Sequence, residues 1–276
     1  MKWPFTTSEK KFSALVIPKS SGLHKDFSTY FDCFSRNTIV FRCINILSQN
    51  LSKIPLINQQ TLSQNLLYEI TRNLMIFGNV FLVNNVVQNI IRINLKKLSD
   101  YQHLFINRSY NDIFGISPIS VCLPAIQTHG VITDYMLSLM QNGGKPWGIF
   151  SCQKTFVSDK YNMQEQMHDL YDKIGKNASF AFIEGDYKWE TIGLSPKELM
   201  ILEMRVKLER EICNIFGIPP VLLGIEDVTF SNFKEARRYF WLETIIPLAT
   251  LIIDQFNMVY DLEITIDVDN ILNIQE

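Results

Sequence analysis

The stretch FGIPPVLLG, residues 216–224, constrains the fold more than any other part of this sequence. It follows a run of charged and aliphatic residues with helical periodicity, ELMILEMRVKLEREICNI, and Gly217 stands where such a helix would stop. The two prolines that follow cannot continue a helix, because proline lacks the amide hydrogen and crowds the preceding turn. A second helical run starts soon afterwards at TFSNFKEARRYF. We therefore expect two long helices, 196–216 and 233–260, joined by a rigid turn and a polar loop over 224–232.

Both helices carry signals at their starts. Ser195 with Glu198 is a capping-box pattern, in which each side chain satisfies a free amide of the first turn. Asn232 with Glu235 is a second pattern of the same kind. Pro247 lies inside the second helix, where the lost backbone hydrogen bond predicts a kink.

The first part of the chain predicts two more helices and a hairpin. Residues 1–35 show no clear periodicity, and we interpret them as an irregular arm. Apolar residues recur at helical spacing over 37–54 and again over 61–77, each time before a proline or a glycine. The segment VFLVNNVVQ predicts two short strands joined at Asn84 and Asn85.

A long helix and a small mixed module follow. Ser117 is placed to cap a helix that starts at Pro118 and stops at the Asn-Gly-Gly of residues 142–144. Over 147–194 we expect a strand at GIFSCQ, a helix over 158–174, and a hairpin formed by SFAFI and YKWETI. LEITIDV predicts a last strand. The expected fold class is α+β, with long helices dominant.

Composition limits the classes of partner. The chain has 276 residues, of which 47% are hydrophobic and 20% charged, and this balance is typical of globular proteins. Its formal net charge is -2, whereas a protein that binds nucleic acid tightly over its whole surface is usually basic. A surface that DNA merely passes is compatible with this charge.

Cysteine usage and hydropathy indicate a cytosolic, soluble protein. The five cysteines include no C-x-x-C pair, so we expect free and mostly buried thiols in a reducing compartment. They are Cys33, Cys43, Cys122, Cys152 and Cys213. We expect no signal peptide, because no basic segment followed by an apolar one opens the sequence. The longest apolar run, TIIPLATLII, contains a proline and is too short to span a membrane.

We find no catalytic motif. None of the four histidines has metal-ligand spacing, and neither G-x-S-x-G nor a phosphate-binding loop is present. We therefore expect no enzyme activity and no cofactor. Asp267 and Asp269 could hold a divalent cation, although a D-x-D of this kind is more often a solvated turn. A metal-dependent nuclease that uses these two carboxylates is the alternative enzyme hypothesis.

The order of several motifs resembles the portal proteins of long-tailed phages, including the portals of gene transfer agents. The motifs are IVFRCINILSQNLSKIPL, LMIFGNVFLV, FGISPISVCLPAI, LMQNGGKPWGIF, and the stretch from LSPKELM through FGIPPVLLG to TIIPLATLI. The resemblance covers roughly residues 38–257. It implies an α+β, phage-portal-like fold with long stem helices, a small α/β clip module and a reduced wing.

The resemblance also divides the chain into segments. They are an N-terminal arm (1–37), a reduced wing domain (38–116), a first stem helix (117–146), a clip module (147–194), a second stem helix (195–223), a tunnel loop (224–232), and a kinked helix with a wing or crown remnant (233–276).

The implied function is a ring of copies, commonly twelve, at one vertex of a capsid. Such a ring is a head–tail connector through which double-stranded DNA passes during packaging and ejection. The implied partners are other copies of the chain, the terminase large subunit, the major capsid protein and a head–tail adaptor, with no membrane. The implied location is the portal vertex of the virion, and the bacterial cytoplasm during assembly. The residues expected to line the channel are Glu226, Asp227, Thr229, Ser231 and Asn232.

The chain departs from the family pattern in three places. Compared with the family pattern, the segment between Ile57 and Asn65 and the wing between Val83 and Phe114 are both shorter, and the crown is short or missing. The alternative is therefore a decayed or domesticated portal of a prophage or gene transfer agent that no longer packages DNA, and a monomeric remnant is its simplest form.

Overall fold

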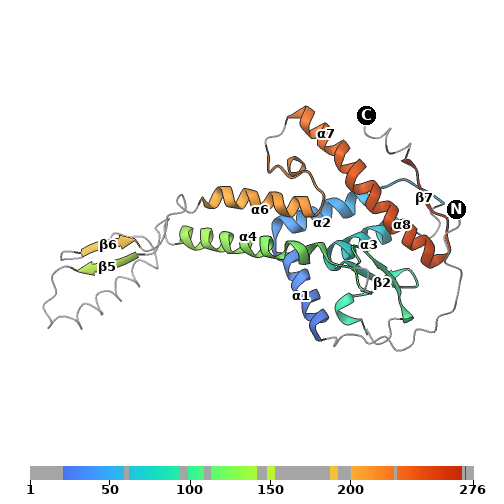
Figure 1. Ribbon diagram of the computed structural model, residues 1–276, viewed down its shortest axis with the longest axis horizontal. Helices are drawn as coiled ribbons and strands as arrows, with labels where there is room; N and C mark the ends of the chain where they lie inside the picture. Colours follow the sequence, from blue (N-terminus) through green and yellow to red (C-terminus); the bar gives the residue numbers. More distant parts are fainter. Residues whose placement is uncertain are drawn as a thin grey trace. The chain divides into compact units, whose positions relative to one another are not determined.

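The computed structural model describes residues 21–58, 62–93, 99–108, 113–141, 148–152, 187–191, 200–226, 229–268 and 271. The chain divides into two compact units, one made of Met1–Ile126 with Glu209–Glu276 and the other of Gln127–Leu208 (Figure 1). Each unit is described by itself below.

The first unit is built around three packed helices. They are α1 (Ser21–Arg36), α2 (Thr38–Leu51) and α3 (Gln64–Phe77), and α1 packs on both of the others. Phe27 and Phe34 of α1 are buried, and the Phe27 ring meets that of Phe77 edge to face. The expected irregular arm is therefore wrong over Ser21–Arg36, where buried aromatic residues hold a helix against the core.

The ends of α2 and α3 follow from local chemistry. The Asn37 side chain accepts hydrogen bonds from the amides of Ile39 and Val40, which would otherwise have no partner in the first turn of α2. Ser63 caps α3 in the same way. Gly78 ends α3 with a φ of 72°, a left-handed conformation that glycine adopts without steric cost. Both predicted helices are confirmed.

A three-stranded antiparallel sheet follows α3. Its strands are β2 (Asn79–Val83), β3 (Val86–Val87) and β4 (Gln102–Phe105), in the order β3-β2-β4. The predicted hairpin is confirmed, because Val83 pairs with Val86 and the two asparagines of the turn have positive φ angles of 49° and 61°. A short 3₁₀ helix, η1 (Ile90–Arg92), lies between β3 and β4.

The last part of the first unit is one long helix and a short strand. The helix runs from Phe230 to Tyr260 as α7 (Phe230–Phe240), a π-helical turn, η5 (Trp241–Ile245), and α8 (Ile246–Tyr260). The π turn lies directly before Pro247, where a kink was predicted, and in it the Ile246 amide bonds the Trp241 carbonyl five residues back. The predicted last strand is confirmed as β7 (Thr265–Ile266), which pairs with β1 (Leu56–Ile57).

This long helix is the one described helix that is long and apolar enough to cross a membrane by length and composition. The apolar run TIIPLATLII is thus part of a 31-residue helix, which is longer than the sequence suggested. Its apolar residues serve the core of the first unit: Ile245, Ala249, Ile252 and Phe256 are fully buried at intervals of three or four residues. The Gln255 side chain also forms two hydrogen bonds with the backbone of Phe105 in β4.

Two helices have residues in both units. The helix α4 (Pro118–Gln141) is capped by Ser117 as predicted, and α6 is Ile201–Ile215. The expected unbroken helix from residue 196 is wrong at Met200, whose φ of 47° is left-handed and incompatible with an α-helix. The capping box at Ser195 and Glu198 lies outside the described residues.

The described part of the second unit contains a two-stranded sheet. The predicted strands are confirmed as β5 (Gly148–Cys152) and β6 (Tyr187–Thr191), which pair antiparallel with Gly148 opposite Thr191. The helix expected over 158–174 and the strand expected at SFAFI lie outside the described residues.

Within the first unit, α2, α4 and α6 meet at buried thiols. Cys43, Cys122 and Cys213 are free and at most 1% exposed, and Cys33 is also a free thiol. Burial raises the pKa of Cys122 to about 12, with smaller contributions from Cys33 and Glu211. A hydrogen bond with Cys213, together with burial, raises the pKa of Cys43. The start of α4 and the end of α6 therefore lie close together on α2, and four of the five thiols are free as predicted.

Candidate functional site

The end of α6 is fixed by a glycine turn. The amide of Ile218 bonds the carbonyl of Cys213, and the amide of Gly217 bonds that of Asn214, which is the hydrogen-bond pattern of a Schellman motif. Gly217 has a φ of +66°, and a Cβ there would come within 2.8 Å of the Thr244 hydroxyl. That hydroxyl donates to the Gly217 carbonyl at 2.6 Å, so the turn is tied directly to the last long helix.

The paired prolines lead into a second tight turn. Pro220–Leu223 is a 3₁₀ helix, η4, with buried Val221 facing the core. Gly224 ends it with a φ of 72°, and the amide of Ile225 returns to the Pro220 carbonyl. The chain therefore reaches residue 224 along a path that local hydrogen bonds fix almost residue by residue.

The far end of the loop is fixed by a capping box. The Thr229 hydroxyl accepts the Asn232 amide, and the Asn232 side chain accepts the Thr229 amide at 2.8 Å. The helix thus starts at Phe230, three residues earlier than predicted. Asn232 is the second partner of this box and not the cap itself, because the threonine three residues before it provides the hydroxyl. Glu235, expected as a capping partner, lies one turn further along α7.

The residues expected to line a channel lie on this loop and its exit. Glu226, Thr229, Ser231 and Asn232 are exposed. Glu226 forms an ion pair with Arg210 of α6 at 3.1 Å, so part of its charge is compensated within the chain. The Ser231 hydroxyl lies 3.3 Å from that of Thr229. Asp227 lies outside the described residues.

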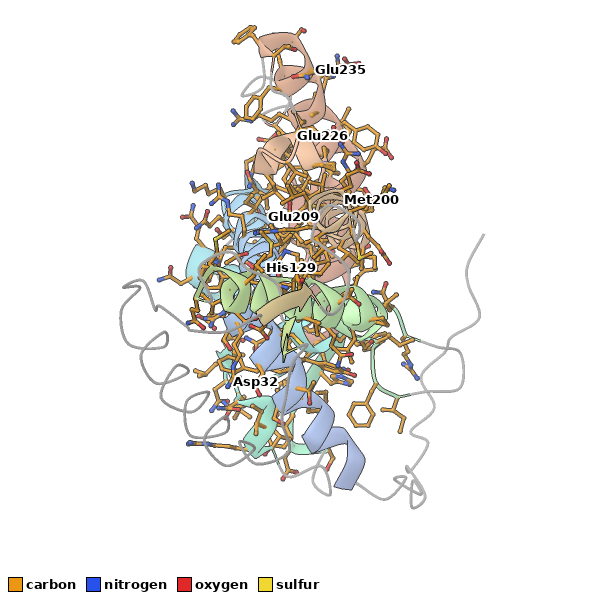
Figure 2. The ribbon with its side chains drawn as sticks, turned by 90° about the vertical axis from the view of Figure 1, so that its left-hand side faces the viewer. Asp32, His129, Met200, Glu209, Glu226 and Glu235 are labelled. Carbon is orange, nitrogen blue, oxygen red and sulfur yellow. The ribbon has the colours of Figure 1, made fainter. Side chains whose placement is uncertain are left out.

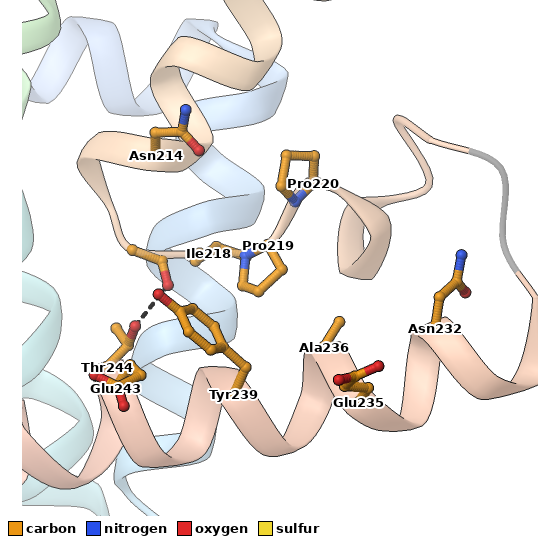
Figure 3. A pocket seen from close by; sticks show the side chains of 11 residues that line it. Asn214, Ile218, Pro219, Pro220, Asn232, Glu235, Ala236, Tyr239, Glu243 and Thr244 are labelled. Carbon is orange, nitrogen blue, oxygen red and sulfur yellow. Dashed lines mark hydrogen bonds between the residues drawn. The ribbon is translucent and has the colours of Figure 1, made fainter.

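A cavity of about 620 Å³ lies between the proline turn and α7. Figure 3 shows Asn232, Glu235 and Tyr239 on the side of α7 that faces the turn. Figure 2 shows Glu226 and Glu235 at the same end of the first unit. The lining residues are Asn214, Gly217, Ile218, Pro219, Pro220, Asn232, Glu235, Ala236, Tyr239, Glu243 and Thr244.

The charged side chains in this lining are all acidic. Glu235 and Glu243 are both exposed carboxylates, with the Tyr239 ring between them along the helix. Carboxylates, amides and a phenol are groups that receive cationic or hydrogen-bond-donating side chains. Sequence analysis missed this cavity, although the spacing of residues 235, 239 and 243 places all three side chains on one face of a helix.

A second cluster of close contacts lies where α3 ends and α4 begins. A Cβ on Gly78 would come within 2.5 Å of the Ile116 carbonyl carbon, and one on Gly115 within 2.2 Å of the Gly78 carbonyl oxygen. The Ser117 hydroxyl, besides capping α4, donates to the Ile76 carbonyl. The Gly-Asn and Gly-x-Ser-Pro motifs therefore meet backbone to backbone, and we call residues 76–79 with 115–117 the glycine junction.

Asn79 connects the glycine junction to the sheet. Its amide nitrogen donates to the carbonyls of Phe77 and Gly115, each at 2.9 Å, and its oxygen accepts the Gly115 amide at 2.7 Å. The same oxygen lies 3.0 Å from Nε2 of His103, whose ring stacks on Phe81. Burial, with a smaller effect of Arg108, lowers the pKa of His103 to about 4, so the imidazole is neutral at physiological pH.

The described residues contain no group of three or more His, Cys, Asp or Glu side chains that could hold a metal ion. Asp267, one of the two carboxylates considered for a nuclease, donates its backbone amide to the Pro55 carbonyl beside the β1–β7 pair. Asp269 lies outside the described residues.

Two curated relatives match most of the chain. An uncharacterized protein of Rickettsia bellii (strain RML369-C) is 26% identical over 90% of this chain and 82% of its own length. An uncharacterized protein of Rickettsia felis (strain ATCC VR-1525 / URRWXCal2) is 24% identical over 97% of this chain and 86% of its own.

Solved structures share the fold. A chain from the neck of a native gene transfer agent particle, determined with C12 symmetry, has a TM-score of 0.59 at 19% identity and covers 89% of this chain and 84% of its own. A chain from the neck of the empty particle, determined with C6 symmetry, has a TM-score of 0.58 at 19% identity, over 89% of this chain and 85% of its own. The α+β, portal-like fold expected from the sequence is confirmed.

The family model of the phage portal protein matches residues 57–275, which is well over half of the chain. This range contains the glycine junction, both helices that have residues in the two units, and the loop with its cavity. The resemblance inferred from the ordered motifs is confirmed, and this chain belongs to the phage portal protein family.

Proposed function

We propose that this protein is a portal, a head–tail connector whose copies form a ring around a channel for double-stranded DNA at one capsid vertex. The family match over residues 57–275 carries the proposal. It is supported by the likeness of the fold to chains from gene transfer agent necks, one of them determined with twelvefold symmetry. That likeness supports a ring of about twelve copies in the virion. Assembly in the bacterial cytoplasm is part of the same proposal.

The composition of α4 supports a function in a ring. Only Asp134 among its 24 residues is charged. Four large apolar side chains of this helix, Val121, Val131, Leu137 and Met140, are between 56% and 68% exposed. Apolar side chains thus lie on the exposed side of α4 as well as on its buried side, and a single copy leaves these four uncovered. Packing against neighbouring copies would cover them.

The segments take the functions that the family resemblance assigns. In this proposal α4 and α6 are the stem, β5 and β6 belong to the clip, and residues 224–232 form the tunnel loop. The clip would face the terminase large subunit during packaging and the head–tail adaptor afterwards, and the wing would contact the major capsid protein.

The chemistry of the loop suits a surface that DNA passes. Strong neutralisation of phosphates would hold DNA in place, because each contact releases counterions and adds affinity. Besides Gly224 and Phe230, the exposed residues in the described part of the loop are two with hydroxyls, one with an amide and one carboxylate that Arg210 partly neutralises. We infer that Glu226, Asp227, Thr229, Ser231 and Asn232 line the channel.

Electron microscopy of the purified protein tests the proposal. We expect rings with a central hole, and a mass many times the 32.1 kDa of one chain. A second experiment tests the loop, because a channel wall that turns basic should hold DNA. In a packaging assay, reversing Glu226 and Asp227 together to lysine should slow DNA passage. Unchanged packaging would show that these two residues do not line the channel. A purely monomeric protein in the first experiment would contradict the ring and favour a remnant.

A further inference from the structure

We propose that α7 joins neighbouring copies in the ring by charge: the basic face of α7 in one copy docks into the acidic groove beside α7 of the next. The acidic groove is the cavity lined by Glu235, Tyr239 and Glu243. The basic face is formed by Lys234 and Arg237, which are both exposed. This inference rests on the proposed ring and specifies one of its interfaces.

The two charged surfaces lie on different sides of one helix. At about 100° per residue, Glu235 is about 40° from Tyr239 around the axis of α7. Glu243 lies in the π-helical turn η5, where that count does not apply, but it lines the same groove. On the same count Arg237 is about 160° and Lys234 about 140° away from Tyr239. Arg238 lies between the two sides, about 100° from Tyr239. Glu235 and the two cations therefore occupy nearly opposite faces of α7, and Glu243 continues the acidic side into η5.

None of these four charges is paired within the described part of the chain. The ion pairs among the described residues are Arg72 with Glu69 and Arg210 with Glu226. Glu235, Glu243, Lys234 and Arg237 are all exposed, so a second molecule can reach them. The groove already contains the acceptors that a guanidinium needs, and an aromatic ring on which it can stack.

Ring symmetry explains why opposite charges would lie on opposite faces. In a ring closed by rotation, each copy contacts one neighbour with one surface and the other neighbour with a different surface. A helix with an acidic side and a basic side meets that requirement in every copy at once. Since α7 begins at the tunnel loop, the same contact would set the spacing of the loops around the channel.

The test uses two reversal variants of the full chain. K234E/R237E removes the cations, and E235K/E243K removes the carboxylates. We expect each variant alone to lose ring assembly by about tenfold or more, as paired interface charges do when one side is reversed. The control K53E/R92E makes the same charge change at exposed residues outside α7, and should assemble like the wild type. Circular dichroism of each variant shows whether the monomer still folds.

Mixing the two reversal variants is the decisive experiment. The K234E/R237E copies have two acidic surfaces and the E235K/E243K copies have two basic ones, so an equal mixture should form alternating rings although neither variant does so alone. The quadruple variant, with the charges exchanged, should also assemble. Raising the salt concentration should weaken wild-type rings, since exposed ion pairs are screened.

Each contrary result has a separate meaning. If both reversal variants assemble normally, or if the mixture and the quadruple variant stay unassembled, the α7 interface is wrong while the proposed ring stands. If K234E/R237E assembles but passes DNA less well, the basic face contacts DNA and not a neighbouring copy. If the wild type forms no rings under any condition, the proposed function and this inference are both wrong.

Discussion

The glycine junction and α7 show opposite relations between polar groups and their partners. At the junction, the Asn79 amide group makes three hydrogen bonds to the backbone and contacts His103, and it is 1% exposed. Along the first turns of α7, charged side chains are exposed and find no ion-pair partner among the described residues. The hydrogen bonds of the junction are made within one chain, whereas α7 carries charges for which the described part of one chain provides no ion-pair partner.

This difference separates residues that hold the fold from residues available for assembly. A buried group with all its hydrogen bonds made is costly to disturb, because its partners lose theirs. An exposed charge contributes little to the stability of the monomer. We therefore expect substitutions at the junction to change stability strongly, and substitutions around α7 to change it little but to affect assembly.

Gly115→Ala should have the largest effect on stability. A Cβ at this position would lie 2.2 Å from the Gly78 carbonyl oxygen and 2.3 Å from that of Ile106, so backbone must move. We expect a loss of about 4 kcal/mol or more in the free energy of unfolding, measured by denaturant titration. Gly130→Ala is the matched control: nothing lies within 4 Å of its added Cβ, and it should be neutral or stabilising by up to about 1 kcal/mol. Equal effects would contradict the close backbone contact.

Asn79→Ala should come next, at about 3 kcal/mol, because it leaves the Gly115 amide and two carbonyls without their buried partner. Asn73→Ala is a suitable comparison, since that side chain donates only to the Glu69 carbonyl on a part-buried helix surface. Its expected cost is below about 1 kcal/mol. Similar losses in the two variants would show that the junction is not special.

His103 should make stability depend on pH. Its pKa in the folded protein is about 4, below the ordinary value of 6.5, so between these values the unfolded chain binds a proton that the folded chain does not. Stability should therefore fall as the pH is lowered from about 6.5 to about 4, by up to roughly 3 kcal/mol. His103→Gln should remove this part of the dependence. A slope that is the same in both proteins would assign it to other groups.

Thr229→Ala should cost about 1 kcal/mol, because it removes the hydroxyl that caps α7. Thr229→Ser keeps the hydroxyl and should recover most of that loss. Hydrogen exchange of the amides of residues 230–233 gives a local measurement, which should be faster in the alanine variant only. No change there would place the start of the helix elsewhere.

Arg210→Gln should have the smallest effect. It breaks the ion pair with Glu226, whose two side chains are 47% and 42% exposed, and such pairs contribute about 0.5 kcal/mol. The variant should unfold at nearly the wild-type denaturant concentration. A loss comparable to that of Asn79→Ala would mean that the loop is as tightly integrated as the junction.

Local signals in the sequence predicted the element ends well. Gly78 and Gly217 stop helices because they adopt positive φ, and Asn84 with Asn85 forms the hairpin turn for the same reason. The start of α7 was misplaced because TFSN offers two possible caps, and only the structure shows that the threonine hydroxyl is used. The left-handed backbone at Met200 could not be predicted, because methionine is not a residue type that signals this conformation.

Long-range contacts account for the features that sequence analysis missed. Three aromatic residues of α1 on its buried side, Phe27, Tyr30 and Phe34, do have helical spacing and could have been recognised. Strand β4 contains QHLF, which has little strand signal, and it forms because β2 supplies its hydrogen bonds. The cavity forms only because the fold brings the proline turn close to α7. The sequence could therefore indicate only that residues 235, 239 and 243 share one face of a helix.

The central claim is that this chain works as one copy of a ring, and the mass of the purified full-length protein tests it most directly. Light scattering at several protein concentrations, combined with negative-stain images of the same sample, measures both size and shape. The account predicts closed rings with a central hole and a mass near twelve times 32.1 kDa. A single species of 32.1 kDa at every concentration, with no rings in the images, would contradict it.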